Sequence, residues 1–322
     1  MEQHSTLPTV EGPIVGFRRG YPFASYYGNI RSIGYVEEEY FISGTATRYQ
    51  PVCNLTDDGR WTLQTTNTSA YRTRILVHRP TDEKKFNGIT VLEWINVSFG
   101  YEVSFGGDTP GLYEDGAVYI LISAQPVGLY GLQVANPQGL RQWDPARYGG
   151  LFIPDDAISY DIYTQVACIV NSSLGQSRIL GGFQPSVVVG VGGSQSGSRL
   201  LSCVNGVQPL VEAFGVLMPL LAASHVSSLD VDPPATKQGG SDMKTITKIR
   251  TDLSIPVRHL CACPSSNDNA EIEGYGQERE PRAAYARRTS RRVDDGRPCR
   301  GRGRLELHCA HPRAVSEWLF SI

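Results

Sequence analysis

The sequence predicts an α/β protein in which a mostly parallel sheet is flanked by helices. A β-rich extension precedes this sheet, and a C-terminal tail that is disordered or mis-framed follows it. Three observations predict this class. Short apolar runs rich in β-branched residues recur after residue 88, a helix-like segment separates two of them, and alternating segments come before them. Such runs are typical of strands covered on both faces, as in a parallel sheet.

The β-rich extension is predicted over residues 35–80. This stretch is rich in Tyr, Thr, Ile and Val and is interrupted by turn-forming clusters such as TDDG at residues 56–59. Strand-forming residues separated by turn signals predict antiparallel hairpins. Residues 71–78 (YRTRILVH) alternate well and are predicted to form one strand.

Three strands of the parallel sheet are predicted next, at residues 89–94, 117–122 and 186–189. Residues 155–170 lie between the second and third strands, begin with two aspartates after a proline, and carry apolar residues at roughly helical spacing. Strand, helix and strand in this order form a βαβ unit. We expect three further elements in chain order: a helix within residues 198–211, a strand within residues 213–223, and a last strand that begins at residues 255–257.

The composition changes beyond about residue 264. Ten arginines occur in the 26 residues from Arg279 to Arg304, and no lysine follows Lys248. A disordered basic tail would have this charge. A GC-rich gene read out of frame would also give such a rise in Arg, Ala, Gly, Pro, Cys and His, and the composition favours this interpretation. We therefore divide the chain into an α/β domain at residues 1–263, incomplete at its C-terminal end, and a tail of doubtful fold at residues 264–322.

Composition also limits the classes of partner. The 322 residues carry 30 basic and 32 acidic side chains, for a net charge of -2, so no overall field favours nucleic acid or an anionic membrane. We expect a small-molecule partner, no nucleic acid and no membrane span, and the sequence does not indicate an oligomeric state. The N-terminus lacks the basic start and apolar centre of a secretory signal, and this predicts a cytoplasmic location.

The cysteines predict neither a disulfide framework nor a metal site. There are seven of them, without regular spacing. Cys261 and Cys263 form a C-x-C pair, but no second pair of ligands accompanies it at the spacing of a zinc site. We expect no metal and no cofactor.

The string GVGGSQSGS at residues 190–198 carries the predicted chemistry. A β-branched strand runs into small residues, a serine stands in the turn, and a helix is expected to follow. In a nucleophile elbow the serine is strained, and small residues two before and two after it let strand and helix approach each other. Gly192 and Ser196 satisfy this rule around Ser194. Ser196 is a competing nucleophile, flanked by Ser194 and Ser198, but only Ser194 has a glycine two residues before it.

Two phosphate-binding interpretations of the same glycines fail on spacing. A Walker loop counted from Gly192 to Gly197 requires a lysine where Ser198 stands. A dinucleotide fingerprint counted from Gly190 requires glycine or alanine where Gln195 stands. A glycine-rich turn without chemistry remains the other alternative.

Six blocks of the sequence resemble those of the alpha/beta hydrolase domain proteins. They are EYFISGTA at residues 39–46, YRTRILV at 71–77, VLEWINVS at 91–98, SAQ at 123–125, DPARYG at 144–149 and GSQS at 193–196. The resemblance covers roughly residues 30–258. It implies an α/β-hydrolase sheet with Ser194 on the elbow.

The resemblance also implies an oxyanion hole and two partners for the serine. One backbone amide would come from Ile95, Asn96 or Val97 and the other from Gln195, because donors aimed at the developing oxyanion lower the barrier. The serine needs a base, and the base needs an orienting acid, in the chain order Ser, acid, His. The segment after Ile255 departs from the family pattern. Within it, the candidates are Asp268 and His311.

Two hypotheses about function follow. The first is a serine hydrolase that acts on small carboxylic esters through an acyl-enzyme intermediate, with Ser194, Asp268 and His311 as its triad. The second is a catalytically incomplete protein of the same fold that lacks its base and acid and has at most a binding role. The segment 259–322 separates the two.

Overall fold

The computed structural model describes residues 7–107, 110–132, 134–135, 137–222, 225–230 and 247–259. The predicted tail at residues 264–322, and with it Asp268 and His311, lies outside these residues.

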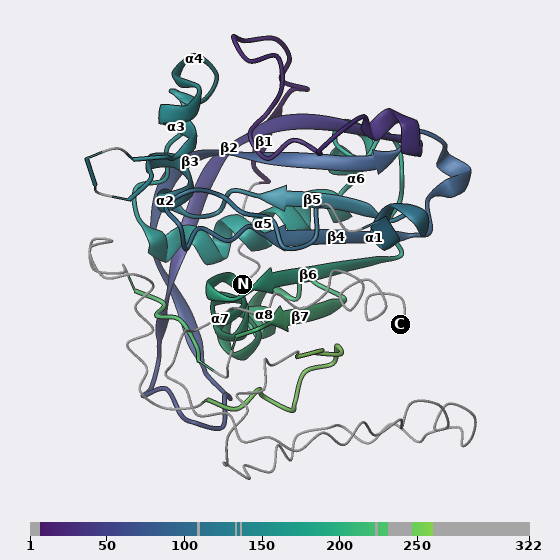
Figure 1. Ribbon diagram of the computed structural model, residues 1–322. Coiled ribbons are helices and arrows are strands. Elements are labelled where there is room, and N and C mark those ends of the chain that lie inside the picture. Colours follow the sequence, from purple (N-terminus) through teal and green to yellow (C-terminus); the bar gives the residue numbers. More distant parts are fainter. Residues whose placement is uncertain are drawn as a thin grey trace, which may run out of the picture.

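The described chain folds around one seven-stranded sheet with the order β1-β2-β3-β5-β4-β6-β7 (Figure 1). The first three strands are antiparallel to their neighbours, and the last four run parallel to one another. The predicted α/β class is therefore confirmed, and the β-rich extension is part of the same sheet. The strands are β1 (Thr9–Glu11), β2 (Tyr35–Pro51), β3 (Leu63–Pro80), β4 (Ile89–Trp94), β5 (Val118–Ile122), β6 (Val187–Gly193) and β7 (Val216–Leu220).

Strands β2 and β3 form one long hairpin. They pair in antiparallel register from Tyr35 and Pro80 to Pro51 and Leu63, with a register shift between Thr47 and Tyr49. Figure 1 shows both strands continuing past the other strands of the sheet. Residues 71–78, predicted as a strand on their own, lie within β3, which pairs with β2 from Leu63 to Pro80, and residues 75–78 also pair with β5.

The parallel strands place the loop after β4 beside the turn after β6. β4 lies between β5 and β6. The chain passes from β4 to β5 on one side of β4 and later reaches β6 on its other side. Loops at such a reversal form the crevice in which α/β proteins bind ligands. Beyond β7, Val257 pairs in parallel with Leu217, which is where the last predicted strand was expected to begin.

Short helices and one longer helix connect the strands. The helix predicted at residues 155–170 is η3 (Asp156–Ile158) followed by α5 (Ser159–Asn171). The helix predicted within residues 198–211 begins earlier, at Gln195, because a single residue makes the turn after β6. The helices are η1 (Ile30–Ile33), η2 (Glu83–Lys85), α1 (Pro110–Glu114), α2 (Pro126–Tyr130), α3 (Leu140–Trp143), α4 (Pro145–Tyr148), η3 (Asp156–Ile158), α5 (Ser159–Asn171), α6 (Ser173–Arg178), α7 (Gln195–Ser202), the π-helix η4 (Cys203–Val207) and α8 (Gln208–Val211).

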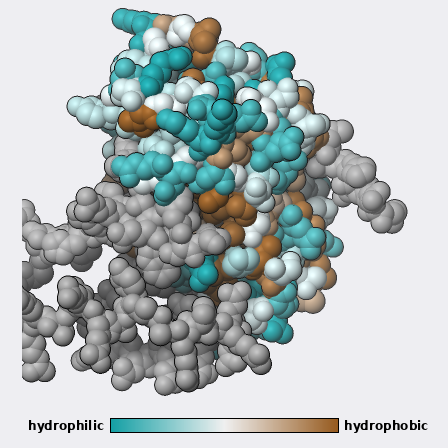
Figure 2. All heavy atoms as spheres, turned by 90° about the vertical axis from the view of Figure 1, so that its right-hand side faces the viewer, coloured by the Kyte–Doolittle hydropathy of each residue, from teal (hydrophilic) through white to brown (hydrophobic). Residues whose placement is uncertain are grey.

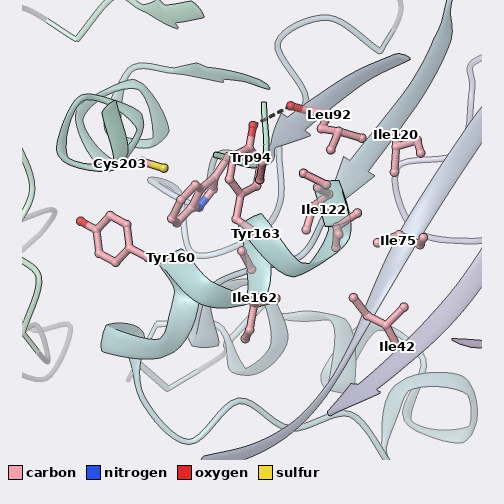
Figure 3. Packing of buried hydrophobic residues seen from close by; sticks show 14 of the residues in the cluster. Ile42, Ile75, Leu92, Trp94, Ile120, Ile122, Tyr160, Ile162, Tyr163 and Cys203 are labelled. Atoms are coloured by element: carbon pink, nitrogen blue, oxygen red, sulfur yellow. Dashed lines mark hydrogen bonds between the residues drawn. The ribbon is translucent and has the colours of Figure 1, made fainter. Parts of the chain in front are cut away.

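The larger core lies between the sheet and α5 (Figure 3). Trp94, at the end of β4, packs between Tyr160 and Tyr163 of α5, with ring centroids 5.4 and 4.7 Å away. The Tyr163 hydroxyl donates a hydrogen bond of 2.8 Å to the Leu92 carbonyl. Burial of each such side chain stabilises the fold by about 1.5–3 kcal/mol before the entropy of ordering is counted.

The surface away from this core is mixed in character. Figure 2 shows the face at the right-hand side of Figure 1, where hydrophilic residues are interspersed with small groups of hydrophobic ones. In Figure 1 the parallel strands point away from that face, toward the side on which α7 begins. The carboxyl ends of β4 and β6 are therefore at the opposite edge.

Candidate active site

Ser194 occupies the turn between β6 and α7. Its backbone has φ 57° and ψ -118°, a conformation that L residues rarely adopt, and its side chain is exposed. The Ser194 N–H donates to the Leu220 carbonyl at 2.9 Å, and the Ser194 carbonyl accepts from the N–H of Ser198 at 3.0 Å. Strained backbone of this kind costs about 1–3 kcal/mol and persists only where the surroundings enforce it. Here the neighbouring strand and the helix enforce it.

The glycines around Ser194 are required by close approach of the backbone. A Cβ on Gly192 would lie 2.7 Å from the Ser196 carbonyl oxygen, and one on Gly193 would lie 2.6 Å from the Phe105 ring. A Cβ on Gly197 would collide with the Leu220 carbonyl oxygen. The small residues therefore let β6, α7 and β7 approach one another, as the elbow interpretation requires.

The competing serine, Ser196, has a different environment. It is fully buried, and its hydroxyl donates to the Ile95 carbonyl at 3.2 Å. Ser196 thus joins α7 to the loop after β4, while Ser194 faces outward. The choice of Ser194 as nucleophile stays a prediction, but the exposed hydroxyl in the turn belongs to Ser194.

The structure brings the predicted oxyanion loop beside this turn, because β4 and β6 are paired up to Trp94 and Gly192. Two of its three amides are already used: the Ile95 N–H donates to Ile122 at 3.4 Å, and the Asn96 N–H donates to Val103 at 3.1 Å. Val97 N–H makes no hydrogen bond within the described part of the chain. Val97 is therefore the available donor of the three.

Gln195 is the first residue of α7. The first amides of a helix have no acceptor within it, and the helix dipole places partial positive charge at this end. Gln195 N–H therefore stands directly after Ser194 without an intrahelical acceptor, as a second oxyanion donor would. The pairing of Val97 with Gln195 across the turn remains a prediction.

The buried carboxylate of Glu93, near the end of β4, holds the loop that follows this strand. Glu93 accepts hydrogen bonds from the Phe105 N–H at 2.6 Å, from the Ser104 hydroxyl at 2.6 Å, and from the Tyr119 hydroxyl. Burial raises the pKa of Glu93 above its ordinary value, although the hydrogen bonds oppose that shift. Sequence reasoning did not single out this residue.

A buried ion-pair cluster holds the far end of the same loop. Arg74 pairs with Glu102 at 2.6 Å and with Glu39 at 2.9 Å, and Glu39 also pairs with Arg147 at 2.6 Å. Burial alone would lower the pKa of Arg74, but Glu102 raises it above its ordinary value. Three of the four residues lie in the sequence blocks at 39–46, 71–77 and 144–149, and that distribution was the available signal for the cluster.

The acid and the base stay predictions. Asp268 and His311 lie outside the described residues, and within those residues the Ser194 hydroxyl makes no hydrogen bond. One described histidine, His225, follows β7 at the same edge of the sheet, and its Nδ1 is buried without a hydrogen-bond partner. The same segment is tied to α7, because Ser227 N–H donates to the Ser198 carbonyl at 3.2 Å.

The described residues hold neither a cluster of metal ligands nor a helix that could span a membrane. No three His, Cys, Asp or Glu side chains among them gather as metal ligands would. None of the helices in the described ranges has the length and apolar character needed to cross a membrane.

A parallel sheet with a strained serine between a central strand and the helix after it defines the α/β-hydrolase class. The family model of the alpha/beta hydrolase domain matches residues 10–288, and the chain belongs to this family. The predicted resemblance is thereby confirmed. Among the curated proteins, none matches the sequence.

Several solved esterase structures are similar over part of the chain. Esterase Est22 is 14% identical with a TM-score of 0.33, over 68% of this chain and 53% of that chain. A structure from an analysis of two fungal esterases from Rhizomucor miehei is 9% identical with a TM-score of 0.34, over 59% of this chain and 46% of that chain. Acetyl xylan esterase 1 from Thermoanaerobacterium sp. is 15% identical with a TM-score of 0.28, over 55% of this chain and 52% of that chain. The chain spans about half the length of these structures.

Proposed function

We propose that this protein is a serine hydrolase that cleaves small carboxylic esters through an acyl-enzyme intermediate, with Ser194 as its nucleophile. The observation that carries the proposal is the conformation of Ser194: φ 57° in a one-residue turn, with the side chain exposed at the carboxyl edge of a parallel sheet. A helix or strand residue would not need this strain, whereas a nucleophile that must project from the sheet does.

The surroundings of Ser194 support the chemical steps. Its Oγ would attack the ester carbonyl carbon, and the carbonyl oxygen would become an oxyanion within reach of the Val97 and Gln195 amides. Collapse of this intermediate breaks the bond to the alcohol, which leaves with the proton taken from Ser194. Water then attacks the acyl group and restores the serine.

A serine by itself is a poor nucleophile, so the proposal requires a base and an orienting acid. We assign these roles to His311 and Asp268. The alternative is an incomplete hydrolase fold that binds esters without turnover.

The test is ester hydrolysis by the full 322-residue chain. We expect turnover of p-nitrophenyl butyrate and labelling of Ser194 by a fluorophosphonate, located by peptide mass spectrometry. Ser194→Ala should lower kcat by roughly 10⁴-fold or more. Ser198→Ala, one helical turn further along, is the matched control and should stay near the wild-type rate.

The base is identified by a second pair of variants. His311→Ala should lower kcat as far as Ser194→Ala does, while His225→Ala should not. A wild-type chain that binds the ester but neither turns it over nor reacts with the fluorophosphonate would establish the incomplete hydrolase instead. Loss of activity in His225→Ala alone would move the base to the segment after β7.

A further inference from the structure

An aromatic side chain lies against the backbone next to Ser194. The Phe105 ring is so close to Gly193 that a Cβ there would lie 2.6 to 2.9 Å from three ring carbons. Phe105 is nevertheless 38% exposed. One side of the ring therefore lies against Gly193, the residue before Ser194, and part of the ring is accessible to solvent.

Phe105 is held in this position by Glu93. One Glu93 oxygen accepts the backbone N–H of Phe105, and the other accepts the hydroxyls of Ser104 and Tyr119. The Ser104 hydroxyl in turn accepts the N–H of Gly107 at 2.7 Å. The segment that carries Phe105 is thus bonded at its backbone to a buried group on β4, which fixes the ring relative to β6.

Apolar residues also occur on the two segments beside the turn. Leu221 follows Leu220, whose carbonyl accepts the Ser194 N–H, and is half-buried with φ 54°. Phe99, on the loop that carries Val97, is 66% exposed. The two segments beside the turn, the loop after β4 and the chain after β7, therefore carry apolar residues, which suits an uncharged ester.

We propose that Phe105 is a specificity-determining residue that packs against an apolar substituent next to the scissile carbonyl, and that Glu93 is the positioning residue that holds it there. This inference rests on the proposed ester hydrolysis. It names the class of substrate as uncharged esters with an aliphatic or aromatic group adjacent to the reacting bond.

The size of the effect follows from apolar contact. A single methylene in a hydrophobic site changes discrimination by roughly 10 to 200-fold. Removal of the Phe105 ring should therefore lower the ratio of kcat/KM for long over short esters by about 10-fold or more. The rate with an acetate ester should change little, because an acetyl group is too short to use the ring.

The experiment compares two ester series on the full chain. The first varies the acyl group, from p-nitrophenyl acetate to octanoate, and the second varies the alcohol of acetate esters. In Phe105→Ala the long-over-short ratio should fall in at least one series, which also identifies the side of the ester that meets the ring. Phe105→Leu should retain most of the ratio. Thermal unfolding of each variant verifies that it is folded.

Phe152→Ala is the matched control. Phe152 is 41% exposed, much like Phe105, but it pairs with Arg72 on β3, which is separated from β6 by the two strands β5 and β4. Its loss should leave both ratios unchanged. Glu93→Gln should lower the ratio in the wild-type background and have no further effect in Phe105→Ala, because a residue that acts through another shows such coupling.

The outcomes separate this inference from the proposal beneath it. Unchanged ratios in Phe105→Ala, with normal turnover of acetate, would overturn the role of Phe105 and leave ester hydrolysis standing. No turnover by the wild type, or turnover that survives Ser194→Ala, would overturn the proposed function and the substrate class together.

Discussion

Asn96 Nδ2 donates a hydrogen bond of 2.9 Å to the carbonyl oxygen of Gly193. This contact joins the loop after β4 to the residue before Ser194, and Asn96 is buried where it does so. The Asn96 Oδ1 accepts the Ser98 N–H at 2.9 Å, so the same side chain also shapes the loop around Val97. Asn96 thus sets the position of a predicted oxyanion donor relative to the predicted nucleophile.

The first prediction concerns this contact. Asn96→Ala should lower kcat for ester hydrolysis by about 10-fold or more with little change in KM, because loss of an oxyanion donor itself costs about 100 to 1000-fold. Asn96→Asp should be more damaging, since it places a carboxylate against a carbonyl oxygen. Steady-state kinetics test this. Asn171→Ala, which removes a similar bond to the Ala213 carbonyl away from the elbow, should stay close to wild type.

The second prediction concerns Glu93 and pH. Its folded-state pKa is raised above the ordinary 4.5 by burial, so the folded state binds the proton more tightly than the unfolded state. The contribution of Glu93 to stability is then largest below about pH 4.5 and is lost as pH rises through the folded-state pKa.

Glu93→Gln should therefore become more stable relative to wild type as pH rises above 4.5, measured by urea unfolding at a series of pH values. Asp161, whose pKa burial also raises, offers a second case, and Asp161→Asn should show the same sign. A stability difference between Glu93→Gln and wild type that does not vary with pH would contradict the assignment.

The third prediction concerns the packing of the elbow. Gly197→Ala should destabilise the fold by about 1–3 kcal/mol, because its Cβ would meet the Leu220 carbonyl oxygen and overpacking costs this much. Gly150→Ala is the control, since a Cβ there has no heavy atom within 4 Å. Denaturant midpoints compare the two. Equal midpoints would show that β7 can move away from α7.

The fourth prediction concerns the buried ion pairs. Glu39→Ala should destabilise the protein by about 3–5 kcal/mol, because it removes the carboxylate that pairs with the buried guanidinium groups of Arg74 and Arg147. Glu11→Ala breaks the exposed pair with Arg72 and should cost no more than about 1 kcal/mol. Urea unfolding of both variants measures the difference, and similar losses would show that burial of the cluster is not what matters.

The sequence determined the features that depend on neighbours along the chain. Runs of β-branched residues predicted β4 and β5 within one residue and located β6 and β7, because a strand buried on both faces must be apolar throughout. The small residues Gly192 and Ser196 indicated the turn at Ser194, because only small residues two before and two after the serine allow strand and helix to meet there. The resemblance in six short blocks extended this to the family.

Only the tertiary structure decided which distant residues meet. It showed that Ser196 is buried against Ile95, that among the described residues the Val97 N–H alone of the three predicted donors makes no hydrogen bond, and that Glu93 holds Phe105 on Gly193. It also gathered Glu39, Arg74 and Arg147 into one buried cluster. These contacts join residues far apart in the chain, and no local pattern encodes them, because sheet order and loop closure set the separation between side chains.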